Sequence, residues 1–381
     1  MEQRFDSVLS SRILPGELSL PSRVMTGWSS VDSFFPSCSE FGQRGLLVHG
    51  QSSRKNGVCD RVLNSVPKGM QVTTWEHAGG EPSLDDLQAL LERAQRFKSE
   101  FVIALGGGSV LDLGKACAGL LGTDQALEDI HDGRVPVGTH GVPLCAVPTT
   151  AGTGSEATRV AVLTNMKTGI KKGLRSPHML ARMVVLDPGL LSGSPREVIT
   201  HAGLDAVTQA VESFVSRGAT RFTEELALLG LQLLCDNVKG VYEDPQSPKA
   251  EPLLMGSFLT GLAFSSSRLG VVHGLAHPLG ARYHQPHGLV CGVLLPLAIA
   301  FNKDAMGQKY EIMSQTCGMD LLKKVESLLE DLGVGNPFAG QAVLDRKAMI
   351  REVLSSGSTQ HNPRGVTKKD VERLLKELFQ G

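Results

Sequence analysis

The pattern of apolar residues changes character near the middle of this 381-residue chain. Up to residue 188, short apolar runs alternate with stretches of helical periodicity, and continuous runs are typical of strands buried on both faces of a parallel sheet. A helix is expected to begin after Ser83, a good N-cap residue that precedes two acidic residues. The runs that we predict as strands are 45–49, 72–76, 101–105, 143–148 and 183–188. This alternation predicts an open, doubly wound, Rossmann-like α/β domain.

After residue 188 the strand-like runs stop, and the apolar positions recur with a helical period. The stretches that we predict as helices are 194–216, 220–241, 251–267, 288–303 and 366–379. A chain of this length also exceeds the size of one ordinary hydrophobic core. We therefore expect an α/β domain over residues 1–188 and an all-helical domain over residues 189–381. Residues 1–20 are weakly patterned and are interpreted as a frayed extension or an edge strand.

The composition narrows the classes of partner. The formal net charge is −1 and aromatic residues make up 5% of the chain, so nothing favours nucleic acid or an anionic membrane. We identify no run approaching the roughly 18 apolar residues that a membrane span needs, and no secretory signal pattern. The seven cysteines are scattered without a CxxC pair, which favours reduced thiols. We expect a cytoplasmic protein that binds neither nucleic acid nor a membrane.

A glycine-rich turn follows the predicted strand at 101–105. Gly106, Gly107 and Gly108 precede Ser109 and a stretch with helical period. Three glycines allow a sharp turn with exposed amide protons, and a helix N-terminus favours an anion. A pyrophosphate fits such a turn at the carboxyl edge of a parallel sheet. The spacing is not GxGxxG, and a tight turn without a ligand is the alternative interpretation.

The predicted strand at 143–148 ends in a second loop of this kind. The hydroxyl-bearing residues in it are Thr149, Thr150, Thr153 and Ser155. Their side chains are able to hydrogen-bond the ribose, phosphate or carboxamide groups of a nucleotide. Two such loops after neighbouring strands favour a dinucleotide over two unrelated tight turns.

Candidate metal ligands lie in the helical half of the chain. His273 and His277 are four residues apart and would share one helix face, and a turn allows His287 to return beside them. Asp205 and Gln209 have the same spacing further upstream. One carboxylate and several imidazoles on two helices are suitable ligands for a divalent transition metal. Histidines that are hydrogen-bonded inside a helical core are the alternative, which the spacing leaves open.

Four motifs occur in an order and spacing that resemble those of a known family. They are GGGSVLDLGK at 106–115, PTTAGTGSE at 148–156, DAVTQAVE at 205–212, and VVHGLAHPLG at 271–280 with PHG at 286–288. These segments resemble the iron-containing (group III) alcohol dehydrogenases, and NPR at 362–364 is similar to that family's C-terminal region. The resemblance covers nearly the whole chain.

The resemblance implies a metal-dependent, NAD(P)-linked oxidoreductase that interconverts a small alcohol and its aldehyde or ketone. It also implies an architecture shared with dehydroquinate synthase, in which an N-terminal dinucleotide-binding domain and a C-terminal helical domain enclose a cleft. The nicotinamide would lie there beside a divalent metal, Fe²⁺ or Zn²⁺, which acts as a Lewis acid on the substrate oxygen.

The same resemblance assigns roles to particular residues. The implied metal ligands are Asp205, Gln209, His273 and His287. The catalytic candidates are His277, as a route for a proton, and Lys171, near the nicotinamide ribose. The positions assigned to the cofactor in and beside the two loops are Gly106, Gly107, Gly108, Ser109, Asp112, Thr149, Thr150, Thr153 and Ser155, with Lys171. For His277, a packing role beside the metal is the alternative.

Two positions depart from the family pattern. Gln209 stands where the family usually has histidine, and an amide oxygen is a weaker ligand than imidazole, so the metal is expected to bind more weakly, to differ or to be lost. Gly50 stands where members that use NAD often carry Asp, and Ser52 and Ser53 follow it, before two cations. These residues favour a 2′-phosphate, so we expect NADP, with NAD possible. An ordinary surface turn is the alternative.

Two other functions remain as alternatives. A sugar-phosphate cyclase of the dehydroquinate synthase type shares the architecture, but the cluster of lysines and arginines that would bind its phosphate is not evident. A metal-free dinucleotide-binding relative would result if the change at Gln209 removed the ion. Relatives often pair through an N-terminal strand, so we expect a homodimer that uses residues 23–27.

Overall fold

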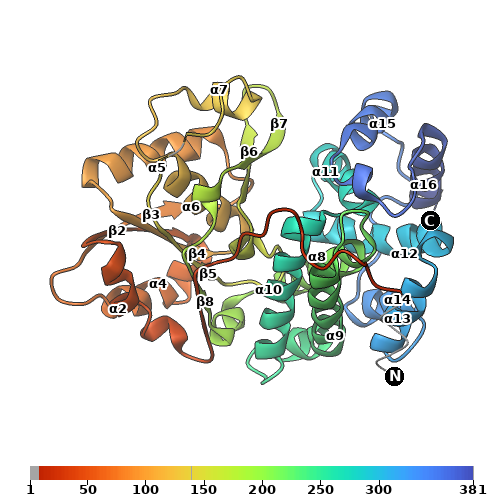
Figure 1. Ribbon diagram of the computed structural model, residues 1–381, viewed down its shortest axis with the longest axis horizontal. Coiled ribbons are helices and arrows are strands. Elements are labelled where there is room, and N and C mark those ends of the chain that lie inside the picture. The colour runs from red at the N-terminus through yellow and green to blue at the C-terminus, as the bar shows by residue number, and fades with distance from the viewer. Residues whose placement is uncertain (1–7, 139, 381) are drawn as a thin grey trace. The chain divides into compact units, whose positions relative to one another are not determined.

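The structure is a computed structural model that describes residues 8–138 and 140–380. The chain divides into two compact units, an α/β unit of Ser19–Ser194 and a helical unit that contains Pro195–Gly381 (Figure 1). The boundary that we predicted after residue 188 falls at the start of the short helix η5 (Pro188–Gly193), which belongs to the α/β unit. This helix follows β8 directly, and its Leu190 is part of the apolar core of that unit.

Of the N-terminal segment, residues 8–18 group with the helical unit and not with the α/β unit that follows. The backbone amides of Arg221 and Phe222 donate to the carbonyl oxygens of Arg12 and Ile13, at 2.8 and 3.0 Å. The segment is therefore held by backbone hydrogen bonds, which a pattern of side-chain hydrophobicity does not report.

The α/β unit is built on a six-stranded sheet in which all strands are parallel (Figure 1). Its strands are β1 (Arg23–Thr26), β2 (Arg44–Gly50), β3 (Gln71–His77), β4 (Phe101–Gly106), β5 (Leu144–Pro148) and β8 (Met183–Leu186). The five predicted strands are confirmed, and β1 adds an edge strand that pairs with β8. The spatial order is β1-β8-β5-β4-β2-β3.

This order fixes where a ligand can bind. The chain runs outward from β2 to β3 and then returns to place β4 on the other side of β2. The carboxyl ends of β2 and β4, at Gly50 and Gly106, therefore meet where the direction of winding reverses. In open α/β sheets the ligand crevice forms at such a point.

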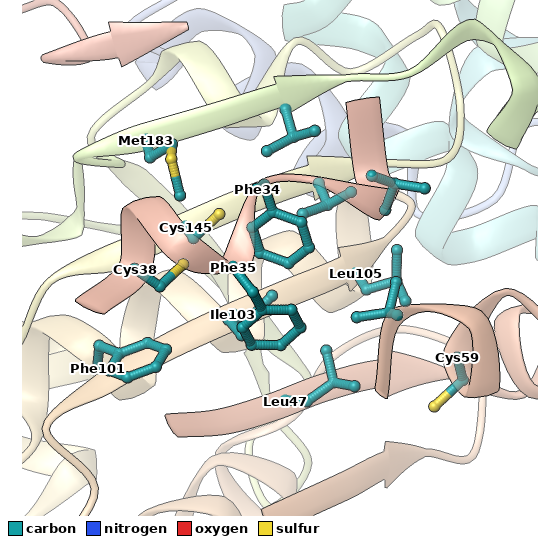
Figure 2. Packing of buried hydrophobic residues seen from close by; sticks show 14 of the residues in the cluster. Phe34, Phe35, Cys38, Leu47, Cys59, Phe101, Ile103, Leu105, Cys145 and Met183 are labelled. Atoms are coloured by element: carbon teal, nitrogen blue, oxygen red, sulfur yellow. The ribbon is translucent and has the colours of Figure 1, made fainter. Parts of the chain in front are cut away.

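Helices cover both faces of the sheet (Figure 1). On one face lie α5 (Leu84–Phe97) and α6 (Gly108–Leu120), and on the other lie α2 (Phe35–Cys38) and α4 (Val58–Asn64). Figure 2 shows the second face, where the rings of Phe34 and Phe35 pack over the sheet side chains. The predicted N-cap at Ser83 is confirmed: its hydroxyl accepts from the amide of Asp86, whose carboxylate accepts in return from the Ser83 amide.

An antiparallel hairpin, which we did not predict, completes this unit. It consists of β6 (Val160–Asn165) and β7 (Ile170–Arg175), paired to each other and not to the main sheet. Five of the six residues of β7 are exposed and two are lysines, so the strand has no apolar pattern to reveal it. The remaining short helices are η1 (Ser30–Asp32), η2 (Ser39–Phe41), α3 (Gln51–Lys55), α7 (Leu127–Asp132), η3 (Ser155–Ala157) and η4 (Pro177–Met179).

The helical unit is organised around α8, which is buried almost continuously from Gly203 to Val215 and packs against α9, α10 and α12. Its helices are α8 (Arg196–Val215), α9 (Arg221–Glu243), α10 (Ala250–Ser267), α11 (Val271–Tyr283), α12 (His287–Met306), α13 (Gln308–Thr316), α14 (Leu321–Asp331), α15 (Arg346–Ser355), η6 (Thr359–His361) and α16 (Lys368–Gln380). The five predicted helices are confirmed as α8, α9, α10, α12 and α16, whereas α11, α13, α14 and α15 lie outside the predicted stretches. Any polar residue on the inner part of α8 is necessarily buried.

From the sequence we identified no apolar run long enough to span a membrane, and helix α12 corrects this expectation. By length and composition it is long and apolar enough to cross a membrane, and it is the one such helix among the described residues. Of its most apolar window, 61% is buried within the protein. It packs against α8, α11, α14 and α16. A buried core helix also passes a test of length and apolar composition, so this test alone does not identify a membrane span.

Candidate metal and nucleotide sites

The two predicted nucleotide loops lie side by side in the α/β unit. Strands β4 and β5 are hydrogen-bonded neighbours, and Gly106 at the end of one is paired in register with Pro148 at the end of the other. The amide of Thr149 donates to the carbonyl oxygen of Gly106 at 3.0 Å. The sheet therefore delivers both loops to the same edge, as the sequence interpretation required.

The glycines of the first loop allow the second loop to approach. A Cβ atom at Gly108 would stand 2.8 Å from Cγ2 of Thr153, which is too close for any other residue without a shift. Gly107 is the N-cap of α6 and provides no side-chain cap, so the first amides of that 13-residue helix have no capping side chain. Amides in this position suit a phosphate oxygen. The partly exposed residues around them are Gly107, Gly108, Ser109, Thr149, Thr150 and Thr153.

Asp112 and Ser155, which we assigned to the cofactor, form bonds within the protein. The Ser155 hydroxyl donates to Asp112 Oδ1 at 2.5 Å, and the amide of Val162 donates to Asp112 Oδ2 at 2.9 Å. Both carboxylate oxygens thus connect α6 to the second loop and to the hairpin. Beside them the fully buried Lys115, which we did not single out, donates to the Ser155 carbonyl oxygen at 2.9 Å.

The end of β2 presents a mixed group of side chains. Gly50 is extended and Ser52 is exposed on α3, whereas Ser53 is buried and its hydroxyl has no partner in the described part of the chain. Arg54 is exposed, and its nearest carboxylate oxygen, on Glu76, lies 3.9 Å away. Ser52 and Arg54 therefore point to solvent near the crevice, and Ser53 does not.

Lys171, the catalytic candidate of the α/β unit, lies outside both loops. It lies on β7, and its ammonium group pairs with Glu81 Oε2 at 2.5 Å. Glu81 precedes α5, so the pair connects the hairpin to the start of that helix. The structure gives Lys171 a partly exposed side chain with an acidic partner.

The predicted metal residues of the helical unit converge from three helices. Asp205 comes from α8, His273 from α11 and His287 from the first position of α12. His273 Nε2 lies 3.3 Å from Asp205 Oδ1, and His287 Nε2 lies 3.8 Å from the same oxygen. A fourth donor, Cys291, joins them, and the ligand atoms of all four residues lie within 4.8 Å of one another.

Glu212 orients the cluster from one side. Its Oε2 lies 2.7 Å from His273 Nδ1, and its Oε1 accepts from the amide of Val272 at 2.7 Å. A carboxylate on the outer nitrogen of a ligating histidine fixes the ring and directs the other nitrogen to the metal. Gly270 allows this contact, because a Cβ atom there would stand 2.8 Å from Glu212 Oε1.

Gln209 and His277 border the cluster in different ways. Gln209 is buried one turn after Asp205 on α8, and its Oε1 has no hydrogen-bond partner among the described residues. His277 is exposed, and its ring stacks on that of His287 with centroids 5.0 Å apart. The buried oxygen of Gln209 is thus available to a ligand, and His277 lies at the solvent side.

The electrostatics of the cluster favour a bound cation. Burial acts to raise the pKa of Asp205, but the charge of His287 and the hydrogen bond and charge of His273 outweigh it and hold that pKa below its usual value. Burial disfavours a charge on His273, yet Cys291, Asp205 and Glu212 together raise the pKa of His273 well above its usual value. The cluster therefore retains positive charge in a buried position, which a divalent ion can supply instead of protons.

These donors fit a divalent transition metal. One carboxylate, two imidazoles, of which that of His273 has an outer carboxylate partner, and an unpartnered buried amide oxygen suit such an ion. The sequence interpretation missed Cys291, although a signal was present. Cys291 is four residues after His287 on a helix, so the two side chains share a face.

Comparison with known proteins agrees with this arrangement. The family profile described as iron-containing alcohol dehydrogenase matches residues 21–188, and that of the Fe-containing alcohol dehydrogenase family, C-terminal, matches residues 199–379. The probable alcohol dehydrogenase EutG of Escherichia coli (strain K12) is 30% identical over 97% of this chain and 95% of its own. Sulfoacetaldehyde reductase of Bilophila wadsworthia is 31% identical, over 89% and 92% respectively.

A solved structure of 1,3-propanediol oxidoreductase superposes with a TM-score of 0.90 at 27% identity, covering 95% of this chain and 99% of that one. The expected architecture, a parallel sheet with helices followed by a large helical part, is thereby confirmed. Family profiles over both halves and relatives along nearly the full length agree with the four motifs. The chain belongs to the iron-containing alcohol dehydrogenase family of oxidoreductases.

Proposed function

We propose that this protein is a metal-dependent, NAD(P)-linked oxidoreductase that interconverts a small alcohol and its aldehyde or ketone. The observation that carries the proposal is the convergence of Asp205, His273 and His287 in one buried cluster. The α/β unit supplies the other requirement, a helix N-terminus at a glycine turn beside a hydroxyl-rich loop. Relatives whose names denote reduction of a small aldehyde, such as sulfoacetaldehyde reductase, support the substrate class.

We propose a separate role for each of the residues at the two sites. Asp205 offers a negative charge, and His273 is held by Glu212 with Nε2 directed at the cluster. A divalent metal bound there would supply Lewis acidity toward a substrate oxygen. His277, exposed and stacked on His287, is the residue that we propose to pass a proton between solvent and the site. The amides after Gly107 would bind a pyrophosphate.

The test is turnover by the purified chain with and without its metal. We expect a chelator to abolish oxidation of NADPH or NADH by small aldehydes, measured at the nicotinamide absorbance band, and Fe²⁺ or Zn²⁺ to restore it. A folded, metal-loaded protein that binds nucleotide but turns over none of a panel of alcohols and aldehydes would contradict the proposal. Cyclisation of a sugar phosphate without net consumption of NAD would instead identify a cyclase. Failure to bind metal would identify the metal-free alternative.

We also propose NADP as the preferred cofactor. At the end of β2 the chain has Gly50 and no carboxylate, and exposed Ser52 and Arg54 follow it. Replacing Gly50 with Asp is expected to lower kcat/KM for NADPH about tenfold, because a carboxylate repels a 2′-phosphate and a tenfold change corresponds to about 1.4 kcal/mol. The site accepts a side chain, since φ at Gly50 is −88° and the nearest atom to a new Cβ lies 3.4 Å away.

The matched control for Gly50→Asp is Gly50→Ala, which adds the Cβ without a charge. It is expected to leave the ratio of kcat/KM for NADPH to that for NADH nearly unchanged. The assignment is contradicted if the wild-type chain prefers NADH, or if both variants lower the ratio equally. The second result would attribute the effect to bulk at Gly50 and not to its charge.

We further propose a cytoplasmic homodimer. The support is the concentration of exposed apolar side chains along residues 13–28, among them Ile13 at 69% and Trp28 at 45% exposure. Strand β1 lies in this stretch at the edge of the sheet, where an unpaired edge is a template for a second strand. Light scattering of the purified chain across a range of concentrations tests the oligomeric state, and a monomer at micromolar concentration would contradict it.

A further inference from the structure

We propose that Cys291 Sγ is a metal ligand in this chain, completing a set with Asp205, His273 and His287, and that this set prefers Zn²⁺ to Fe²⁺. The inference rests on the proposed metal-dependent function only in placing an ion at this cluster. It does not depend on the substrate, the nucleotide or the direction of the reaction.

Four of the six distances between the ligand atoms lie within about 0.3 Å of the edges of a tetrahedral site, and all six are within 4.8 Å. Donors at about 2.0–2.1 Å for nitrogen or oxygen and about 2.3 Å for sulfur stand roughly 3.3–3.6 Å from one another around Zn²⁺. Cys291 Sγ lies 3.6 Å from His287 Nε2 and 3.9 Å from His273 Nε2. Asp205 Oδ1 lies 3.3 and 3.8 Å from the same two nitrogens. Small movements would bring all four donors to one ion.

The position of Cys291 on α12 makes this arrangement more than a chance approach. His287 is the first residue of α12 and Cys291 is one turn later, so both side chains are directed to the same face. The thiol is buried, and its contacts to the two imidazole nitrogens are long for hydrogen bonds. A thiol held between two ligating imidazoles has the geometry of a further ligand.

Charge and ligand type then determine the preferred ion. The ligand form of cysteine is the thiolate, so metal binding transfers the Cys291 proton to solvent. Asp205 and the thiolate are the two anionic donors among neutral imidazoles, and Glu212 adds a carboxylate on the far side of His273. Thiolate is a soft ligand that selects zinc over harder ions, and Zn²⁺ also ranks above Fe²⁺ in general affinity.

Gln209 is the competing candidate for the fourth position. It lies one turn after Asp205 on α8, and its buried Oε1 has no partner within the described residues. It is a neutral oxygen donor, so it would favour a harder ion than the thiolate does. The two candidates therefore predict different spectra and different metal preferences.

Cobalt substitution distinguishes them without any measurement of turnover. The full chain loaded with Co²⁺, without nucleotide or substrate, is expected to show a near-ultraviolet thiolate-to-cobalt charge-transfer band. Cys291→Ser should lose this band and weaken Zn²⁺ binding by more than the roughly 10–100-fold that loss of an outer hydrogen-bond partner costs. The ratio of Zn²⁺ to Fe²⁺ affinity should fall with it. Gln209→Ala should keep the band.

The matched control is Cys235→Ser, because Cys235 is also buried and its Sγ lies 4.0 Å from Cys317 Sγ. These two thiols are a second place for cobalt to bind. A band that survives Cys291→Ser but disappears in Cys235→Ser overturns the proposal. Zinc X-ray absorption of the wild-type chain keeps the test valid if a variant fails to fold. It should show one sulfur neighbour at about 2.3 Å, and only nitrogen and oxygen neighbours would overturn the proposal.

These outcomes separate the inference from the proposed function. A cobalt–thiolate band in a protein that reduces no aldehyde would support Cys291 as a ligand and contradict the oxidoreductase assignment. Metal-dependent aldehyde reduction by a protein with no sulfur neighbour at its metal would do the reverse.

Discussion

Replacing Asp205 with Asn is expected to remove most of the bound metal and to lower kcat/KM by about 10³-fold. Asp205 Oδ1 is the atom that both imidazole nitrogens approach, and the residue is 3% exposed. Asparagine keeps the shape but removes the negative charge, and a metal acting as a Lewis acid is worth several kcal/mol at about 1.4 kcal/mol per factor of ten. Metal content by elemental analysis, together with kcat/KM at saturating added metal, measures both effects.

The control for Asp205→Asn is Asp304→Asn, the same change at an exposed position on α12. It is expected to leave metal content and kcat/KM near the wild-type values. If Asp205→Asn keeps its metal and loses less than about tenfold in kcat/KM, Asp205 is a packing residue and the cluster is not the catalytic metal site. Circular dichroism of both variants shows whether the helical unit has stayed folded.

The arrangement of the sheet was largely predictable from the sequence, for a physical reason. Strands such as 101–105 are buried on both faces, so their apolar runs are continuous and the following glycine turn is easily placed. Strand β7 could not be found in this way, because its lysines face solvent and its pairing depends on backbone hydrogen bonds to β6. Residues 8–18 are likewise held by backbone hydrogen bonds, to the helical unit, which side-chain patterning does not report.

The metal cluster was predictable in part. Helical spacing predicts that Asp205 and Gln209 share one helix face, and that His273 and His277 share another. It does not predict what that face contacts. It does not tell that His277 is directed to solvent while His273 is buried against Glu212. That depends on how α11 packs against α12 and α15, which is a tertiary property.

Cys291 shows the opposite case, in which the information was present. Its spacing from His287 is the same as that between His273 and His277. It lies outside the PHG segment that carries the family resemblance, so the resemblance assigns it no role. A family pattern directs attention to the positions that it contains. A ligand that this chain acquires elsewhere on the same helix face is found from helical geometry.

The buried Lys115 supports the hydroxyl-rich loop of residues 149–156, and its replacement is expected to lower the stability of the α/β unit. Lys115 is fully buried on α6, and its ammonium group donates to the Ser155 carbonyl oxygen and to Thr158 Oγ1, at 2.9 and 3.0 Å. It also donates to the Val160 carbonyl oxygen and lies 3.1 Å from Asp112 Oδ1. Burial lowers the pKa of Lys115, and the charge of Asp112 opposes this. The lysine thus joins α6, the hydroxyl-rich loop and the hairpin.

Replacing Lys115 with Met is expected to destabilise the α/β unit by about 3–5 kcal/mol, because the partly buried Asp112 loses its cationic partner and the Ser155 and Val160 carbonyl oxygens lose their donor. At about 2–4 °C per kcal/mol, the Tm should fall by roughly 6–20 °C. The KM for the nucleotide should rise, since the loop that contains Thr153 loses its support. The metal content should be unchanged, because the ligands lie on other helices.

Lys68→Met, at an exposed position, is the control and should leave the Tm within about 2 °C of wild type. An unchanged Tm in Lys115→Met would show that the buried lysine is replaceable by an apolar side chain of similar volume, and that the second loop is held by the bonds of Asp112 alone.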